Sequence, residues 1–231
     1  MESPNLTAPE PARTPTRSIL VGDGVAWLAQ GVLPPTHAVV TSLPDASEVR
    51  SIGFDAWRAW FVDVAALACA QVAARAVAIF YQTDVKLDGR WIDKGQLVGR
   101  GAERAGAACL FHKIVCRAPA GTATFGRPGY AHLTAFSREL RVTEKASSAD
   151  VLPELGEMPW ARAMGTAACE EVCRFLLGST ACRVVVDPFC GLGTVLAVAN
   201  AYGLDALGVE LSAKRASKAR GLRFVRGAGI A

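Results

Sequence analysis

The segment of residues 183–210 constrains the fold more than any other part of the chain. A run of β-branched residues ends at Asp187, the chain turns through Gly191 and Gly193, and a helix begins at Thr194. Glycines at such a turn let the backbone approach a ligand without a Cβ in the way, and the helix N-terminus offers unpaired amides. We therefore expect this segment to form a binding site in a doubly wound α/β sheet.

An acidic residue completes this unit. The next apolar run ends at Glu210, which follows Gly191 by 19 residues. A carboxylate at this place can accept hydrogen bonds from both hydroxyls of a ribose. No Gly-Lys-Ser/Thr follows the turn, so a phosphate-binding P-loop is not expected. The segment predicts a site for a nucleoside cofactor, although the Gly-x-Gly alone could arise by chance in a chain rich in Gly and Ala.

Short apolar runs alternate with stretches of helical period through the rest of the chain, which indicates a mostly parallel sheet covered on both faces. The loop of residues 118–129 is too short for a crossover helix, so the two strands that it joins should be antiparallel. The expected strands are 18–21, 38–41, 75–81, 108–116, 130–136, 183–186 and 206–209. The expected helices are 24–30, 54–74, 94–105, 160–177, 194–202 and 213–224.

We expect a single folded domain over residues 18–226. The chain of 231 residues is 51% hydrophobic and 20% charged, which excludes a disordered or fibrous protein. Residues 137–159 are polar and contain two prolines, so they predict a surface linker between the two parts of this domain, 18–136 and 160–226. The proline-rich residues 1–17 are expected to be a disordered leader and not a secretory signal, and residues 227–231 a tail.

Hydropathy, cysteine content and charge limit the kinds of partner and site that the chain can have. Gln71 and Arg75 interrupt the longest apolar stretch, so no membrane span is expected, and the interpretation is a cytoplasmic protein. The seven cysteines contain no CxxC pair and are interpreted as reduced structural residues, with no metal site. A basic cluster near the end of the chain could contact phosphate or form a solvated helix face. Its members are Lys214, Arg215, Lys218, Arg220, Arg223 and Arg226.

The stretch DPFCGLGTVLAVANAYGLDALGVELS resembles the cofactor-binding half of the amino-methyltransferases related to DNA adenine-N6 and cytosine-N4 methylases. In that family the first segment holds the methionine part of S-adenosyl-L-methionine (AdoMet), and the acid after the next strand holds the ribose. The resemblance implies a class I AdoMet-dependent methyltransferase fold, with a Rossmann-like, mostly parallel sheet of seven strands and one antiparallel strand. The cofactor-binding residues that it implies are Asp187, Pro188, Phe189, Gly191, Gly193, Thr194 and Glu210.

The N-terminal part is similar to the circularly permuted branch of the family, in which the catalytic half precedes the cofactor half. Gly22 and Asp23 end the first strand, and the resemblance implies that Asp23 contacts the adenine amino group of AdoMet. The sheet would then be entered at its third strand and would end with its first two. Residues 158–165 match a cofactor-adjacent segment of the family by position only.

Residues 42–45 (SLPD) stand where this branch has a Ser/Asp/Asn-Pro-Pro-aromatic loop, which implies Ser42, Pro44 and Asp45 as catalytic residues. By resemblance, Ser42 and the carbonyl group of the next residue would accept hydrogen bonds from an exocyclic amine of a flipped base. Asp45 replaces the aromatic residue that stacks on the base. Three interpretations stay open: Asp45 accepts the amine proton, Trp91 or Tyr130 provides the stacking surface, or the acceptor is not a base.

Ligands of open α/β sheets bind beyond the carboxyl ends of the parallel strands. Residues 82–93 are dense in polar groups directly after a buried strand, which fits either substrate contact or a solvated turn. Residues 126–130 reach the same edge at the start of the antiparallel strand. His112 is expected to be a satisfied core histidine and not a catalytic one. The candidate substrate-binding residues are Gln82, Asp84, Lys86, Trp91, Arg127 and Tyr130.

The leading functional interpretation is an AdoMet-dependent methyltransferase that N-methylates an exocyclic amine of a nucleic-acid base. RNA is favoured over DNA, because the compact chain leaves no room for a separate target-recognition domain. Two alternatives are a methyltransferase with a protein or small-molecule acceptor, and a non-catalytic protein of this fold that binds a partner. The altered residues 42–45 motivate both alternatives.

Overall fold

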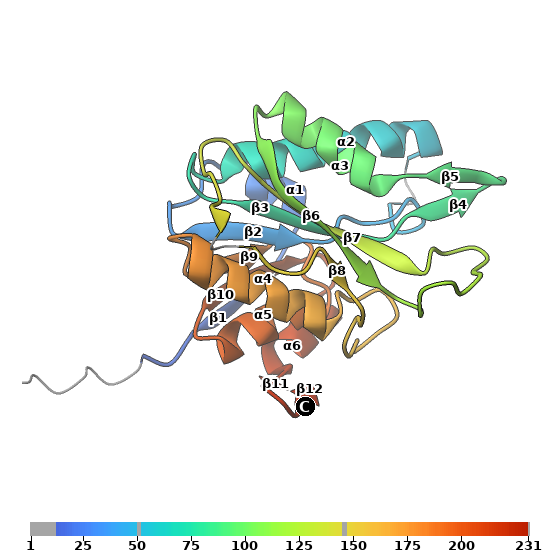
Figure 1. The fold of residues 1–231 in the computed structure, drawn as a ribbon. Coiled ribbons are helices and arrows are strands. Elements are labelled where there is room, and N and C mark those ends of the chain that lie inside the picture. Colours follow the sequence, from blue (N-terminus) through green and yellow to red (C-terminus); the bar gives the residue numbers. More distant parts are fainter. Residues whose placement is uncertain (1–12, 50–51, 145–146, 231) are drawn as a thin grey trace, which may run out of the picture.

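The computed structural model describes residues 13–49, 52–144 and 147–230. Within them, the centre of the molecule is a sheet of eight strands. Its strands are β1 (Arg17–Val21), β2 (His37–Thr41), β3 (Ala78–Gln82), β6 (Ala108–Cys116), β7 (Tyr130–Ser137), β8 (Val151–Leu152), β9 (Val184–Asp187) and β10 (Asp205–Glu210). In space they follow the order β1-β10-β9-β2-β3-β7-β6-β8, so the first strand lies beside strands from near the end of the chain (Figure 1).

Helices cover both faces of this sheet, with α1 to α3 on one face and α4 to α6 on the other (Figure 1). Their bounds are α1 (Gly24–Leu28), α2 (Phe54–Gln71), α3 (Lys94–Arg104), α4 (Thr166–Ser179), α5 (Thr194–Ala201) and α6 (Ala213–Gly221). Two small hairpins lie outside the sheet, β4 (Val85–Leu87) with β5 (Arg90–Ile92), and β11 (Phe224–Val225) with β12 (Gly229–Ile230). The expected α/β class is confirmed.

The strand directions place the functional edge. β1, β10, β9, β2 and β3 are parallel to one another, so their carboxyl ends meet at one edge of the sheet. β7 is antiparallel to both of its neighbours, β3 and β6. The expectation of an antiparallel pair joined by residues 118–129 is therefore confirmed, and the amino end of β7 lies at the same edge as the carboxyl end of β3.

The core lies around the central strands. Residues 38–40 of β2 and 78–80 of β3 are completely buried, as expected for parallel strands that are covered by helices on both faces. On the α2 side, Trp57 and Phe61 are fully buried, with ring centroids 5.2 Å apart. None of the described helices combines the length and apolar character needed to cross a membrane.

Helix starts follow from local sequence. The side chain of Asp23 caps α1 by accepting hydrogen bonds from two backbone amides, and Asp93 caps α3 by accepting one from Gln96. α4 begins at Thr166, later than the expected residue 160, because residues 160–164 form turns along a cavity at the edge of the sheet.

Several expected boundaries differ from the structure. Residues 137–159 are not only a linker, because β8 within them pairs with β6 and adds an eighth strand to the expected seven. Residues 16 and 17 were expected to belong to a disordered leader, but they are part of the fold. Arg17 begins β1, and the backbone N–H and hydroxyl of Thr16 donate to Asp205 Oδ1 at 2.7 and 2.9 Å. Residues 1–12 of that leader lie outside the described residues. The expected tail 227–231 contains β12.

Candidate functional site

A cavity of about 770 Å³ opens at the carboxyl edge of the sheet. Its wall combines residues that follow β1 and β2 with residues that follow β9 and β10, so stretches from both ends of the chain share one site. The expected site residues in the wall are Asp23, Ser42, Pro44, Asp45, Arg127, Asp187, Pro188, Phe189, Gly191, Thr194 and Glu210. The expected residues outside it are Gln82, Asp84, Lys86, Trp91, Tyr130 and Gly193.

A close backbone contact joins the two halves of this wall. A Cβ on Gly24, the first residue of α1, would lie 1.9 Å from the carbonyl oxygen of Pro188 and 3.1 Å from the ring of Phe189. Only glycine permits this approach. The sequence analysis did not single out Gly24, although its place directly after Gly22-Asp23 was a signal.

Asp187 lies at the end of β9, buried beneath the cavity. Its Oδ1 accepts a hydrogen bond from the hydroxyl of Thr41 at 2.7 Å and another from the backbone N–H of Phe189 at 3.1 Å. Burial raises the pKa of Asp187 to about 7, and the nearby charge of Glu210 raises it too, against the lowering effect of these hydrogen bonds. Thr41 thus ties β2 to β9, a role that the sequence analysis missed.

The glycine turn and Glu210 form the other side of the cavity. Gly191 has a φ of 55°, and its N–H donates to Glu210 Oε2 at 3.0 Å. The N–H of Ser212 donates to Glu210 Oε1 at 2.8 Å. Each carboxylate oxygen can accept a further hydrogen bond, so Glu210 is both fixed in place and able to bind a ligand.

Trp160 stands over this turn. A Cβ on Gly191 would lie 3.6 Å from the Trp160 ring, and the guanidinium carbon of Arg215 lies 5.1 Å from the centroid of that ring. Arg162, two residues further on, forms an ion pair with Glu48 at 3.1 Å. Residues 158–165, expected beside the cofactor site from position alone, thus contribute to the cavity wall.

Residues 42–45 form the loop after β2, at the carboxyl edge of the sheet. All four residues line the cavity, and the Leu43 side chain is also buried in the core. Asp45 Oδ1 accepts a hydrogen bond from the ammonium group of Lys94, which is itself buried, and Asp45 Oδ2 lies 3.9 Å from Arg127. Both oxygens of Asp45 therefore face cations, an arrangement that no local sequence signal indicated.

The expected substrate residue Asp84 is the centre of a buried polar cluster beside the cavity. Its carboxylate accepts hydrogen bonds from Trp91 Nε1 at 2.9 Å, the N–H of Lys94 at 2.8 Å and His132 Nε2 at 3.0 Å. Burial alone would raise the pKa of Asp84, but these hydrogen bonds and the charge of His132 lower it. Asp84 thereby fixes the start of α3, and with it the position of Lys94.

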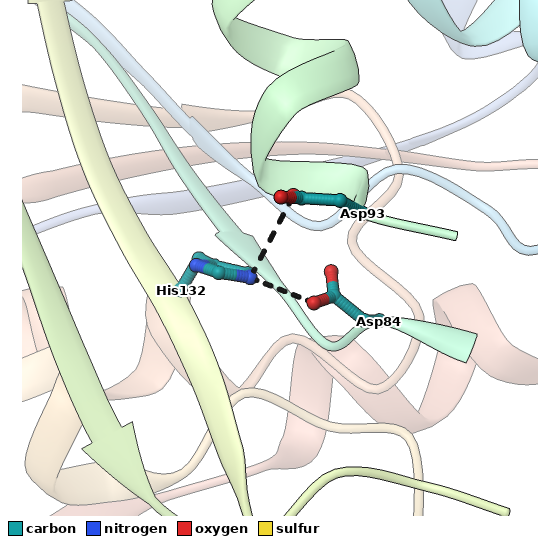
Figure 2. Close-up of side chains that lie close together, drawn as sticks. All are labelled: Asp84, Asp93 and His132. Atoms are coloured by element: carbon teal, nitrogen blue, oxygen red, sulfur yellow. Dashed lines mark hydrogen bonds and ion pairs between the residues drawn. The ribbon is translucent and has the colours of Figure 1, made fainter. Parts of the chain in front are cut away.

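Figure 2 shows His132 between Asp84 and Asp93, pointing toward both. Ligand atoms of these three residues lie within 4.8 Å of one another, a spacing that suits a metal ion. Both oxygens of Asp84 already accept hydrogen bonds, and His132 Nε2 is 3.9 Å from Asp93 Oδ1. Both Asp84 oxygens therefore already have hydrogen-bond donors within the protein.

The expectation of a core histidine at residue 112 was wrong. His112 is exposed on β6, and the buried partner is His132 on β7, whose Nδ1 lies 2.9 Å from His112 Nε2. Although the residue is exposed, partial desolvation of its ring on the His132 side and the charge of His132 lower the pKa of His112. The strand alternation instead turns Lys113 inward, where its ammonium donates to two backbone carbonyl groups.

Two buried polar groups near the site lack a hydrogen-bond partner among the described residues. The hydroxyl of Tyr81, on a residue only 3% exposed, lies in the cavity wall, and burial raises its pKa. The amide of Gln82 is buried on the opposite face of β3, outside the cavity. Native proteins satisfy most buried polar groups, and the Tyr81 hydroxyl has the side chains of Arg117 and Thr83 near it, which lower its pKa against the effect of burial.

The basic cluster near the end of the chain is partly engaged within the protein. Arg215 lies over Trp160, and Arg220 donates to the carbonyl oxygen of Ile19 at 2.8 Å. Arg226 lies over the ring of Tyr202 at 4.4 Å. The remaining members, Lys214, Lys218 and Arg223, are exposed or partly exposed.

The strand order, the glycine turn after β9 and the acid that ends β10 define the class I methyltransferase fold. Solved structures with this fold include a proposed DNA modification methylase from Thermus thermophilus, with a TM-score of 0.68, 21% identity, and coverage of 89% of this chain and 94% of that one. The same protein has been solved in complex with S-adenosyl-L-methionine, with 20% identity and coverage of 89% and 92%.

A second similar structure is the PvuII DNA methyltransferase, specific for cytosine N4, with a TM-score of 0.69, 12% identity, and coverage of 89% of this chain and 86% of that one. A third is the M1.HpyAVI–SAM complex, with a TM-score of 0.60, 13% identity, and coverage of 89% and 99%. No protein-family model and no curated protein sequence matches the chain. At these identities the likeness establishes the fold.

Proposed function

We propose that this protein is an AdoMet-dependent methyltransferase that methylates an exocyclic amine of a nucleic-acid base. The observation that carries the proposal is the meeting of two distant stretches in one cavity wall, Asp23 with residues 42–45 from one side and residues 187–191 with Glu210 from the other. Two of the similar proteins are described as a DNA modification methylase and a DNA methyltransferase, and two of the structures are AdoMet complexes, which supports it.

The groups in the cavity fit AdoMet. Gly191 presents backbone without a side chain at the turn, and Glu210 keeps acceptor capacity for the ribose hydroxyls. Asp23 uses only Oδ1 to cap α1, so its Oδ2 can accept from the adenine amino group. The Tyr81 hydroxyl adds a further polar group to the cavity wall.

AdoMet, when bound, supplies a methyl group that its sulfonium charge already activates. The protein therefore has to align the acceptor and exclude water. In the proposed mechanism Ser42 Oγ and the carbonyl oxygen of Leu43 accept hydrogen bonds from the amine, which favours the geometry in which its lone pair is available. Ser42 stands in the cavity wall, directly after the buried strand β2, as this role requires.

The surroundings of Asp45 argue against one of the three interpretations of residues 42–45, in which Asp45 accepts the amine proton. Lys94 and Arg127 face its two carboxylate oxygens, so we assign Asp45 to positioning the loop, and the amine proton passes to solvent after the methyl group is transferred. The aromatic groups in the cavity wall, which are candidates for stacking on a base, are Trp60, Tyr81, Trp160 and Phe189.

The experiment has two stages. Calorimetry should detect AdoMet binding to the wild-type protein, and Glu210→Ala should weaken it. Transfer of a labelled methyl group is then measured with tRNA, rRNA, single-stranded DNA and duplex DNA as separate acceptors, RNA being the acceptor that we expect. Ser42→Ala should retain AdoMet binding and lose transfer; a protein that does not bind AdoMet contradicts the proposal.

A second candidate function keeps the reaction and changes the acceptor. Leu43 points into the core and Asp45 is ion-paired, so the loop itself offers no surface that stacks on a base. Label that enters a protein or a small molecule, and no nucleic acid, would favour this candidate. AdoMet binding without transfer to any acceptor would instead favour a non-catalytic role.

A further inference from the structure

Two segments project beyond the carboxyl edge of the sheet, the β4–β5 hairpin and the loop of residues 117–129 between β6 and β7 (Figure 1). Each carries an exposed aromatic ring. Phe125 in the loop is completely exposed, and Trp91 in the hairpin is 45% exposed. Lys86 Nζ lies 5.1 Å from the Trp91 ring centroid and 5.9 Å from that of Phe125, so one cation lies near two rings from different segments.

The exposed Trp91 ring is held in place from below. Its Nε1 donates to the buried carboxylate of Asp84, and its ring stacks on Tyr130 with centroids 6.5 Å apart and an interplanar angle of 26°. A ring that is fixed before binding loses little conformational entropy when a ligand covers it. Trp91 is therefore an ordered platform for a flat ligand.

The hairpin and the loop are themselves mainly basic, although the Asp84 carboxylate binds Trp91 from below and Asp93 follows the hairpin. The hairpin and the loop together carry four basic residues and one acid, Asp88. The basic residues are Lys86, Arg90, Arg117 and Arg127. Arg127 also lies in the wall of the cavity, 3.9 Å from Asp45, which connects this surface to the catalytic loop. We name the set Lys86, Arg90, Trp91, Phe125, Arg127 and Tyr130 the aromatic rim.

We propose that the aromatic rim binds a single-stranded stretch of nucleic acid beside the methylated base, an inference that rests on the proposed function and specifies its substrate. Exposed aromatic faces stack on unpaired bases, and interleaved cations contact the phosphates of the same strand. A duplex offers base edges and phosphates but keeps its base faces covered by neighbouring pairs. Rings that protrude into solvent, as Phe125 does, therefore select an unpaired strand.

Fluorescence anisotropy with a short labelled oligonucleotide tests the proposal, using RNA and DNA single strands of one sequence and their blunt duplexes. We expect a single strand to bind about 10-fold more tightly than its duplex. Phe125→Ala should weaken single-strand binding by about 10-fold, because one stacked base is lost, and Phe125→Trp should restore it. Lys86→Ala should lower the slope of log affinity against log salt by about one, as expected for one lost phosphate contact.

Arg75→Ala is the matched charge control, since Arg75 is exposed just before the amino end of β3, at the edge of the sheet opposite to the rim, and should leave binding unchanged. Equal or tighter duplex binding, an unaffected Phe125→Ala variant, or equal binding of an acidic peptide would overturn the proposal. AdoMet binding and methyl transfer to a protein, without nucleic-acid binding, would contradict the role proposed for the aromatic rim but would agree with a methyltransferase activity. Single-strand binding without AdoMet binding would support the role of the aromatic rim and contradict the proposed methyltransferase activity.

Discussion

At the scale of single residues, Asp187 shows how much of the site depends on one buried carboxyl group. It is enclosed between β9 and β2, and Thr41 is the side chain that donates to it. Leaving a buried acceptor without its donor costs more than an average hydrogen bond contributes. The pairing of Thr41 with Asp187 therefore matters for stability as well as for the shape of the cavity floor.

Thr41→Val should lower the free energy of unfolding by about 1–3 kcal/mol, because it keeps the volume of the side chain and removes the hydroxyl donor. Urea denaturation near pH 8, where Asp187 carries most charge, is the measurement. Thr124→Val in the exposed loop is the control and should have little effect. Equal stability of the two variants would mean that Asp187 finds another donor.

The raised pKa of Asp187 predicts a pH dependence of stability. In the folded protein the pKa is about 7, above the ordinary value of 3.8, so between these values the folded state binds more protons than the unfolded state. The contribution of this group is complete below about pH 4 and is lost as the pH rises toward about 7. Its size is at most a few kcal/mol.

Denaturation of the wild-type protein and of Asp187→Asn across about pH 4–8 isolates this contribution. The difference in unfolding free energy between the two proteins should move in favour of the variant as the pH rises. Parallel curves would indicate that Asp187 titrates normally in the folded state.

At the scale of elements, the packing of α3 on α2 distinguishes two glycines of one helix. A Cβ on Gly101 would lie 2.6 Å from both the Cβ of Ala65 and the carbonyl oxygen of Val62, whereas a Cβ on Gly99 would meet no atom within 4 Å. The two helices approach closely because Gly101 has no side chain. The first residue of this helix is Lys94, which pairs with Asp45.

Gly101→Ala should destabilise the protein by about 1–3 kcal/mol, because the added methyl group separates α2 from α3. Gly99→Ala should stabilise it by about 0.5–1 kcal/mol, since alanine is a better residue than glycine in a helix interior. Thermal or urea unfolding of both variants checks the pair. Effects of the same sign would contradict the packing described for α3.

At the scale of the whole molecule, the site depends on the contact between the first helix and the segment after β9. Gly24→Ala should weaken AdoMet binding by at least about 10-fold, because a Cβ cannot fit 1.9 Å from the Pro188 carbonyl oxygen and the two halves of the cavity must separate. Calorimetry measures the affinity, and circular dichroism checks that the fold is retained.

Gly53→Ala, at a place where a Cβ meets nothing, is the control for this variant. Unchanged affinity in Gly24→Ala would show that the two halves of the wall act independently.

The parts of the fold that depend on local pattern could be predicted from the sequence. β9, the glycine turn and β10 followed from periodicity and glycine spacing, and the direction of β7 followed from a short loop. Other features depend on partners distant in sequence. Thr41 gains its role from Asp187, 146 residues away, and His132 from Asp84, 48 residues away. Strand β8, two residues long, has too few residues to give a pattern.

The position of β1 has a consequence for how the chain reaches its native state. Val21 of β1 is paired with Glu210 of β10, so the earliest of the described strands has its only sheet neighbour, among the described residues, in a segment that is synthesised much later. Contacts between such distant residues slow folding, because a large loop must close first. During translation β1 therefore stays unpaired, and chaperones that bind nascent chains have that whole interval in which to cover it.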